Sequence, residues 1–341
     1  MAAQLHLVWP IDDALEVRVN QFLPAKHNHI FNEPRYFQLH RRSDRDLHAQ
    51  LVRKGTDRVL ASLAFYDVGD GVFAAPRRGT FGSIGLNDTV DALSIERFVE
   101  TTLSHLIAAG ARCIRIKCAP FSHQPSEGAV FTNVLLRHGF VLADHELNYD
   151  LAVDGRPLSD RMGSGNAKRL RKCVREGLTA QPVPIDEYLR VFQVIEDNRR
   201  RRGFPMTMSA EQIGDMARAF PDRLHLFSVV APSTPPEMCA AAVTVAVADS
   251  ILYVLYWGDA AGMETFSPIA LLASSIYEFC QTHGFTRLDV GTSTVAGVPN
   301  HGLIQFKRNL GFVESLKLSF IWKDAARDTP AATRVCREVQ A

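Results

Sequence analysis

The chain lacks the features of a metalloprotein, a disulfide-stapled protein or a membrane protein. Its 341 residues contain only six cysteines, with no CxxC pair and no His/Cys cluster at zinc-ligand spacing. We therefore expect no metal site and no disulfide scaffold, but buried free thiols. No apolar run approaches the roughly 18 residues that span a bilayer, and the first residues lack the basic and apolar regions of a secretory signal. These absences predict a cytoplasmic protein without a transmembrane segment.

The chain also lacks a charge imbalance. Its net charge of +1 argues against a general nucleic-acid binder, DNA included. One segment departs from this balance, because residues 161–202 contain eleven Lys or Arg and five acids, which gives +6 against −5 for the rest. A local basic zone on a mildly acidic body can recruit a phosphate-bearing ligand.

Motifs of the common hydrolases and nucleotide-binding enzymes are missing as well. There is no GxSxG elbow, the histidines are scattered, and the glycine-rich segment 79–85 lacks the Lys-Ser/Thr ending of a phosphate loop. We therefore interpret 79–85 as a strand edge or a pocket wall.

The sequence does contain a long-period repeat. A helical pattern over 95–110 that ends at a glycine returns over 269–284, a spacing of 174 residues. A second glycine, Gly139, returns as Gly311 with a spacing of 172. Self-similarity of this kind indicates two copies of one fold.

Each copy shows a meander of short strands, a helix, a strand, a second helix and a last strand. This order predicts an α/β (α+β) fold in which helices cover a mixed sheet. The predicted parts are an N-terminal domain over 1–155, an interdomain helical segment over 156–220, a C-terminal domain over 221–323 and a flexible tail over 324–341. We further predict two short helices before residue 45, and interdomain helices over 163–177, 185–202 and 209–219.

The first interdomain helix has two distinct faces when it is projected at 100° per residue. The residues of its cationic face are Lys168, Arg171, Lys172 and Arg175, and those of the opposite face are Ala167, Leu170 and Val174. A purely solvated face is one interpretation. Binding of a phosphate or polyphosphate is the other, and we favour it because no acid balances these cations at i+4.

A loop rich in Gly, Ser, Thr and Pro, residues 291–299, follows a buried-looking strand and opens a helix. Hydroxyls such as that of Ser293, together with the backbone N–H groups of a helix that starts at Asn300, can receive a substrate. Further along, Lys307 stands where the first copy has the uncharged Leu135. A cation that breaks the duplication in one copy is a good functional candidate. Tyr256 is either a pocket wall or a core aromatic.

Together these patterns resemble the Fem-type transferases, members of the GNAT acyltransferase superfamily with two GNAT-like domains in tandem. The resemblance extends over about residues 5–322. The stretches that carry it are 30–36 (IFNEPRY), 76–82 (PRRGTFG), the basic helix 167–177, and 300–311, which contains Asn300, His301, Gly302, Leu303, Phe306, Lys307 and Gly311.

This resemblance implies a bacterial-type transferase that moves an activated acyl group, typically aminoacyl from aminoacyl-tRNA, to an amine acceptor in cell-wall, polysaccharide or natural-product biosynthesis. No cofactor beyond the donor is implied. By the same resemblance Lys307 stabilises the tetrahedral oxyanion, and the basic helix holds phosphates of the acceptor or of the tRNA end. The residues expected to bind substrate are Asn300, Phe306, Tyr256, Ser293, Lys168, Arg171, Lys172 and Arg175.

Two alternatives stay open. One is a GNAT N-acetyltransferase that uses acyl-CoA as donor, and the other is a non-catalytic module that binds a phosphorylated ligand. The sequence leaves the acyl group, the acceptor, the general base and the oligomeric state undetermined.

Overall fold

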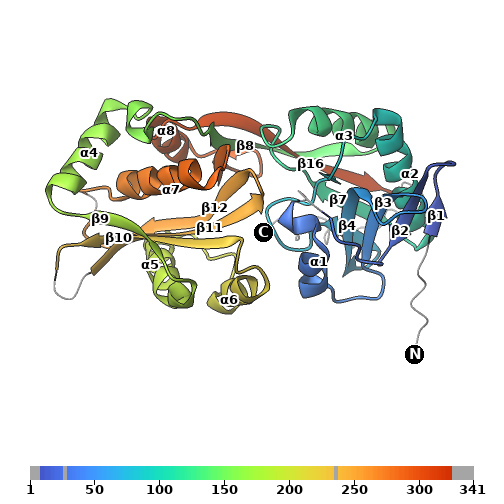
Figure 1. Cartoon of the computed structure of the whole chain (residues 1–341), viewed down its shortest axis with the longest axis horizontal. Helices are drawn as coiled ribbons and strands as arrows, with labels where there is room; N and C mark the ends of the chain where they lie inside the picture. The colour runs from blue at the N-terminus through green and yellow to red at the C-terminus, as the bar shows by residue number, and fades with distance from the viewer. Residues whose placement is uncertain (1–7, 26–28, 234–236, 264, 325–341) are drawn as a thin grey trace. The chain divides into compact units, whose positions relative to one another are not determined.

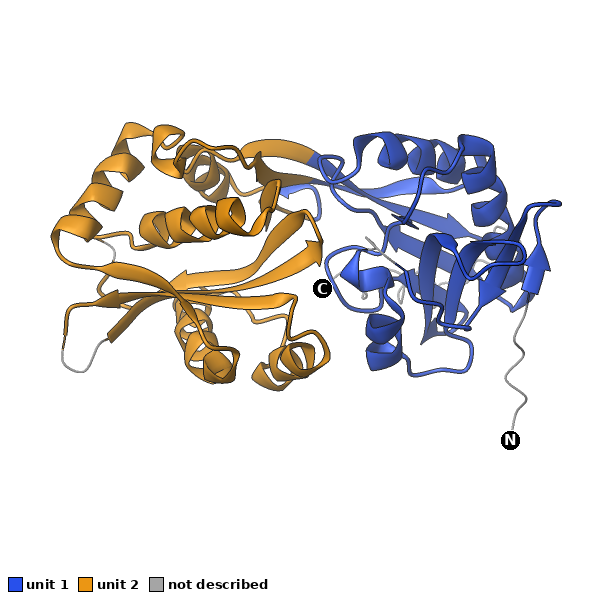
Figure 2. Cartoon of the chain, viewed as in Figure 1, with its two compact units in different colours: residues 1–146, 296–298, 316–341 blue, residues 147–295, 299–315 orange. Residues whose placement is uncertain are grey.

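The computed structural model describes residues 8–25, 29–233, 237–263 and 265–324 (Figure 1). The chain divides into two compact units, unit 1 (1–146, 296–298 and 316–341) and unit 2 (147–295 and 299–315), coloured separately in Figure 2. This division differs from the predicted boundaries. The helical segment 156–220 belongs to unit 2, and residues 316–323 belong to unit 1. The predicted tail lies outside the described residues, apart from Asp324.

The strands of unit 1 follow the order β1-β2-β3-β4-β5-β7-β16, with β6 paired to β4. Neighbouring strands are antiparallel except for the parallel pair β5 and β7. Their bounds are β1 (Val8–Pro10), β2 (Leu15–Val19), β3 (Leu47–Arg53), β4 (Val59–Gly69), β5 (Val72–Ala75), β6 (Gly85–Leu86), β7 (Cys113–Lys117) and β16 (Val313–Lys323). The prediction of two helices before residue 45 is partly wrong, because β1 and β2 form a hairpin there.

The helices of unit 1 are α1 (Pro34–His40), α2 (Ala92–Ala108) and α3 (Pro125–Arg137), together with the 3-10 turn η1 (Ile30–Asn32). The apolar stripe that the sequence shows on α2 is buried, with Phe98 fully inaccessible. It packs with residues of α3, β7 and β16, such as Phe131, Ile116 and Phe320, in one apolar core. Burial of this stripe accounts for the position of α2 on the sheet.

The strands of unit 2 follow the order β8-β13-β12-β11-β10-β9. Their bounds are β8 (Val141–Ala152), β9 (Thr179–Val183), β10 (Leu224–Ala231), β11 (Glu237–Ala248), β12 (Ile251–Asp259) and β13 (Arg287–Thr292), and a separate pair is formed by β14 (Thr294–Val295) and β15 (Val298–Pro299). Strands β9 to β12 are an antiparallel meander, and β12 pairs in parallel with β13.

The helices of unit 2 are α4 (Ser164–Arg175), α5 (Tyr188–Arg201), α6 (Ala210–Ala219), α7 (Ile269–His283) and α8 (His301–Asn309), with the 3-10 turns η2 (Leu158–Asp160) and η3 (Ile185–Glu187). In Figure 1, α7 covers one face of this sheet, and α5 and α6 cover the other. The two-layer cover confirms the predicted α/β class. No helix within the described ranges is long and apolar enough to span a bilayer.

The last strand of each sequence copy completes the sheet of the other unit. Strand β8 ends the first copy, yet its residues 148–152 pair with β13 in unit 2. Strand β16 ends the second copy, yet its residues 319–323 pair with β7 in unit 1. The order of elements is repeated as predicted, but neither copy is self-contained.

Candidate functional site

The loop that follows β13 leads directly into α8, the helix that carries Lys307. Asn300 caps this helix, because its side-chain oxygen accepts a hydrogen bond from the Leu303 N–H at 3.0 Å. The Asn300 N–H in turn donates to the Ser293 carbonyl at 2.9 Å. Asn300 therefore fixes the start of the helix, a role that Asn fills well.

Lys307 is buried, with 2% of its surface exposed. Its Nζ donates to the carbonyl oxygens of Gly291 and Thr292, both at 2.8 Å, and lies 5.5 Å from the centre of the Tyr149 ring. Burial lowers the pKa of Lys307 to about 7, although the Asp289 carboxylate acts in the opposite direction. The site thus contains an amine that titrates near neutral pH, a property common among catalytic groups.

Asp289 anchors the other side of the same loop. Its carboxylate is fully buried and accepts hydrogen bonds from the Gly291 N–H at 2.7 Å and from Asn148 Nδ2 at 2.8 Å. Gly291 has φ +73°, and a Cβ there would lie 2.8 Å from Tyr253 Oη. Position 291 therefore requires glycine. Sequence reasoning missed Asp289; its signal was an acid inside an otherwise apolar strand.

Ser293 lies on the same loop and is 1% exposed. Its backbone N–H donates to the Leu147 carbonyl at 2.8 Å. Its buried Oγ has no hydrogen-bond partner among the described residues. Because a buried hydroxyl normally finds a partner, this Oγ is a polar group suited to a ligand.

The two predicted aromatic residues lie in different surroundings. Phe306 packs against the core of unit 2 and meets the Trp257 ring edge-on, with ring centres 6.2 Å apart. Tyr256 is hydrogen-bonded through its hydroxyl to Thr207, and the Arg199 guanidinium lies 5.5 Å from its ring centre. Burial raises the pKa of Tyr256. These contacts connect Tyr256 to α5 and to the segment before α6.

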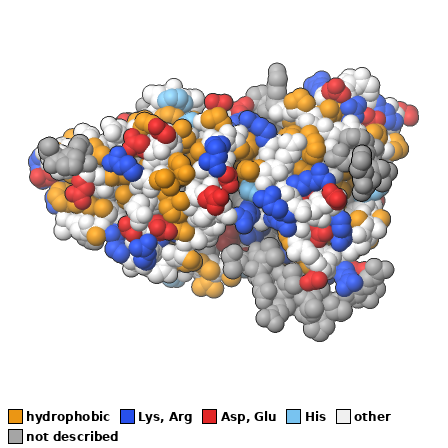
Figure 3. Space-filling view, turned by 90° about the horizontal axis from the view of Figure 1, so that it is seen from below, with side chains coloured by type: hydrophobic (Ala, Val, Ile, Leu, Met, Phe, Trp, Pro, Cys, Tyr) orange, Lys and Arg blue, Asp and Glu red, His pale blue; other side chains and the backbone are white. Residues whose placement is uncertain are grey.

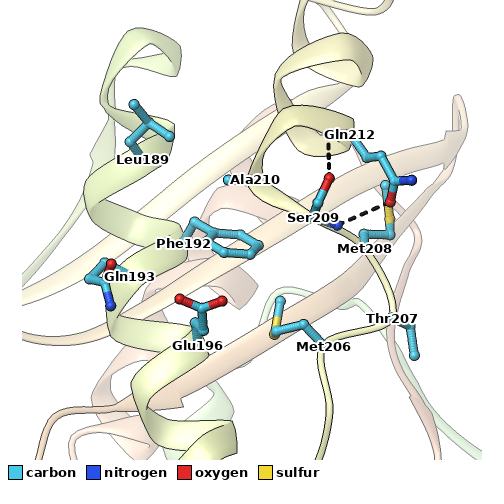
Figure 4. Close-up of a pocket in the computed structure, with 10 residues that line it drawn as sticks. All are labelled: Leu189, Phe192, Gln193, Glu196, Met206, Thr207, Met208, Ser209, Ala210 and Gln212. Carbon is cyan, nitrogen blue, oxygen red and sulfur yellow. Dashed lines mark hydrogen bonds between the residues drawn. The ribbon is translucent and has the colours of Figure 1, made fainter.

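A groove of about 670 Å³ opens between α5 and residues 206–212. Figure 4 shows the Phe192 ring and the Glu196 carboxylate directed from α5 toward the segment that carries Met206. Apolar side chains also gather on the surface of unit 2 in the view of Figure 3. The residues that line the groove are Leu189, Phe192, Gln193, Glu196, Met206, Thr207, Met208, Ser209, Ala210 and Gln212. Sequence reasoning missed this groove, since no motif marks it.

Helix α4 presents its cations largely as predicted. Lys168, Arg171 and Arg175 are exposed, and Arg175 pairs with Glu176 at 3.1 Å. Lys172 is half-buried, because its Nζ donates to the Thr265 carbonyl at 3.4 Å and lies 4.3 Å from the Phe266 ring centre. In the part of the chain that the structure describes, Lys168 and Arg171 make no ion pair.

The apolar face of α4 was predicted only in part. Ala167 and Leu170 pack against the core of unit 2 as expected. Val174 is 60% exposed, which contradicts its predicted position on the packing face. The buried residues of this helix are Asn166 and Cys173, so the packing face runs along Asn166, Leu170 and Cys173 and is turned away from Val174.

The cysteines follow the prediction with one exception. Cys118, Cys173, Cys239 and Cys280 are buried free thiols, whereas Cys113 is disulfide-bonded. Within the described residues, no group of three His, Cys, Asp or Glu is placed to hold a metal ion.

Comparison with known proteins gives a structural likeness only. No protein-family model and no curated protein sequence matches the chain. The solved structure of FemX is similar over 94% of this chain and 96% of its own, with a TM-score of 0.67 and 12% identity. L-PGS from Bacillus licheniformis is similar over 82% of this chain and 86% of its own, with a TM-score of 0.56 and 12% identity.

A third similar structure is the C-terminal DUF2156 domain of a putative lysylphosphatidylglycerol synthetase from Agrobacterium fabrum. It matches 78% of this chain and 82% of its own, with a TM-score of 0.54 and 13% identity. The chain therefore has a Fem-type, GNAT-like fold, which confirms the resemblance at the level of fold. At such identities the likeness assigns no residue roles.

Proposed function

We propose that this protein is an acyl- or aminoacyltransferase that moves an activated acyl group to an amine acceptor, with its reactive centre at the Lys307 loop. The observation that carries the proposal is the buried ammonium of Lys307, held by two backbone carbonyls on a loop that also contains the unpaired Ser293 hydroxyl. The Fem-type fold supports it.

Acyl transfer requires charge stabilisation at one oxygen atom. The neutral amine of the acceptor attacks the carbonyl carbon of an ester or thioester, a C–N bond forms, and the carbonyl electron pair moves to the oxygen. The amine then loses a proton, the oxyanion electron pair re-forms the C=O bond as the C–O or C–S bond of the donor breaks, and the leaving alkoxide or thiolate takes up a proton. A fixed cation beside the oxyanion lowers the barrier of the first step.

Lys307 suits this role in its protonated form. Two of its three N–H bonds point to the carbonyls of Gly291 and Thr292, which leaves one for the substrate oxygen. The Ser293 hydroxyl is a second candidate donor. Because the pKa of Lys307 is about 7, the ammonium form makes up roughly half of the protein at neutral pH.

The exposed cations of α4 are proposed to bind phosphates of the donor or of a phosphate-bearing acceptor. Lys168 and Arg171 are the main candidates because they make no ion pair within the described ranges, and Arg175 shares its charge with Glu176. Lys172 already contacts the Thr265 carbonyl and the Phe266 ring. We propose no cofactor besides the donor.

Thermal stabilisation by candidate donors and acceptors tests this proposal. The panel contains acetyl-CoA, longer acyl-CoAs, charged aminoacyl-tRNAs and nucleotide-linked amine precursors. A ligand specific for the folded state stabilises it by RT ln(1 + [L]/Kd), so a micromolar binder is visible at about a hundredfold excess. A shift with aminoacyl-tRNA supports aminoacyl transfer, and a shift with CoA thioesters alone assigns the donor to CoA. Stabilisation by phosphorylated ligands but by no acyl donor would indicate a binding module and refute the proposal.

A further inference from the structure

Three cations lie on one face of the unit 1 sheet, opposite its helix-covered core. In β7, Ile114 and Ile116 belong to the core, so Arg115 and Lys117 point to the other face. Ser319 and Ile321 of β16 are the register partners of Lys117 and Arg115. Lys317, two residues before Ser319, therefore lies on the same face as both.

Two of these charged side chains are unusually buried. Arg115 is 7% and Lys317 is 8% exposed, and Lys117 is half-buried. Lysine and arginine are rarely this inaccessible unless they are paired. Lys317 has such a partner, since its Nζ lies 3.8 Å from Glu146 Oε2.

Arg115 has no comparable partner. It makes no hydrogen bond or ion pair with the residues that the structure describes, and its Nη1 is buried without an acceptor. Burial lowers the pKa of Arg115, and the Asp144 carboxylate acts in the opposite direction. Burial also lowers the pKa of Lys117, and the nearby Lys317 and Arg115 lower it further. Among the described residues, the carboxylates that act on these three cations are Asp144 and Glu146.

The sequence repeat allows Arg115 to be compared with the equivalent residue of the second copy. A spacing of 174 residues places Asp289 of the second copy at the position of Arg115, and Asp289 lies near the buried ammonium of Lys307. A spacing of 172 places Lys307 at the position of Leu135, which is fully buried in unit 1. The first copy therefore has an apolar residue in place of the lysine, and a cation in place of the acid. A phosphoryl group would supply the acceptor atoms that Arg115 lacks among the described residues.

We infer that Arg115, Lys117 and Lys317 form an anion site in unit 1 that binds a phosphoryl group, as a phosphate ester or a diphosphate. A guanidinium donates two parallel hydrogen bonds to phosphoryl oxygens, and ammonium groups on neighbouring strands add charge from the side. The inference concerns binding alone and does not require that the protein transfers an acyl group.

Titration of the full chain with sodium pyrophosphate, against sodium chloride of equal ionic strength, tests the site. We expect saturable binding by calorimetry, weakened about tenfold or more in Arg115→Met, because hydrogen bonds to a charged group contribute at least that factor. The matched control is Arg112→Met, an exposed arginine just before the same strand, whose affinity should stay within about twofold of the parent. Arg115→Met should also melt no lower than the parent without ligand, since it removes an unpaired buried charge.

Further variants test the site independently of Arg115→Met. Lys117→Gln, at a half-buried position, should also weaken the binding of pyrophosphate. This variant replaces Arg115→Met in the test if Arg115→Met does not fold. In the background Lys168→Gln/Arg171→Gln, which removes phosphate binding at α4, Arg115→Met should still weaken pyrophosphate binding about tenfold. Absence of saturable binding, equal affinity in Arg115→Met and Arg112→Met, or loss of affinity in the α4 variant alone would overturn the inference.

Discussion

At the scale of single residues, Lys307 shows how burial turns an ordinary side chain into a functional candidate. The sequence marks it as a cation at a position where the first copy has Leu135, but only the structure shows its burial and its two carbonyl acceptors. Asp289 was missed although it is an acid inside an otherwise apolar strand, and Asn148 and Tyr253 carry no such signal in the sequence. Their roles arise from contacts across the sheet, and no spacing along the chain encodes these contacts.

The lowered pKa of Lys307 predicts a specific pH dependence of stability. The folded pKa of about 7 lies below the ordinary value of 10.5, so between these values the unfolded chain binds more protons than the folded one. The free energy of unfolding should therefore rise from pH 7 toward pH 10.5 in the parent relative to Lys307→Met. Urea denaturation of both proteins at pH 6, 8 and 9.5 checks this. Parallel pH profiles would show that Lys307 is not perturbed.

At the scale of elements, the loop between β13 and α8 depends on glycine at position 291. Gly291→Ala should destabilise the protein and displace the carbonyl that holds Lys307, because φ is +73° and Tyr253 Oη blocks the Cβ. The matched control is Gly284→Ala at the end of α7, where φ is +78° and no atom lies within 4 Å of the Cβ. Its cost should be about 1 kcal/mol, from the backbone conformation alone.

Chemical denaturation of the two glycine variants separates the cost of the backbone conformation from the cost of the contact between the Cβ and Tyr253. Gly291→Ala should lose clearly more stability than Gly284→Ala, and the added change Tyr253→Phe should recover part of the difference by removing Oη. Equal losses in the two variants would mean that the loop accommodates a side chain, and that its geometry is not a constraint on Lys307.

Helix α4 gives the second prediction at this scale. Lys168→Gln/Arg171→Gln should raise KM for a phosphate-bearing substrate several-fold, leave kcat nearly unchanged and reduce the salt dependence of binding, because these cations act on charge and not on the reaction. Arg190→Gln on α5, an exposed arginine paired with Glu187, is the control. A fall in kcat at constant KM would contradict a binding role for this face.

The elements were predicted unevenly, for physical reasons. The long amphipathic helices α2 and α7 were located within a few residues because their apolar stripes repeat at helical spacing. The short strands β1, β2 and β9 were missed, since a few residues carry too little periodicity. Strand β6 begins at Gly85, the last residue of the segment 79–85 that we interpreted as a strand edge or a pocket wall. The packing face of α4 was predicted correctly for Ala167 and Leu170 but not for Val174, because a helix with few apolar residues defines its phase poorly.

At the scale of the whole molecule, the exchanged last strands make each unit depend on residues from both sequence copies. A fragment over residues 1–155 lacks β16, and therefore lacks Leu318 and Phe320 of the unit 1 core. We predict that this fragment does not fold cooperatively alone, because β7 loses one of its two neighbouring strands and the core loses two large side chains. Fusion of residues 313–324 to the fragment through a flexible linker should restore folding.

Near-UV circular dichroism and amide NMR spectra of the two fragments measure this directly. We expect a dispersed spectrum for the fused fragment and not for the fragment 1–155. A fragment 1–155 that folds cooperatively would contradict the strand exchange. The exchange could not be predicted from the repeat. Self-similarity along the chain defines which elements occur, whereas the pairing partner of β8 or β16 is decided by tertiary packing.

Lys307 is the residue on which the proposed transfer of an activated acyl group depends most. The most direct test incubates the protein with labelled aminoacyl-tRNAs, and in parallel with labelled acyl-CoA, in the presence of nucleotide-linked amine acceptors, and measures the labelled amide. We predict amide formation with one donor class, reduced about a hundredfold or more in Lys307→Met and little changed in Arg308→Met, the exposed neighbour on α8. No amide with either donor, or equal rates for the parent and Lys307→Met, would contradict the account.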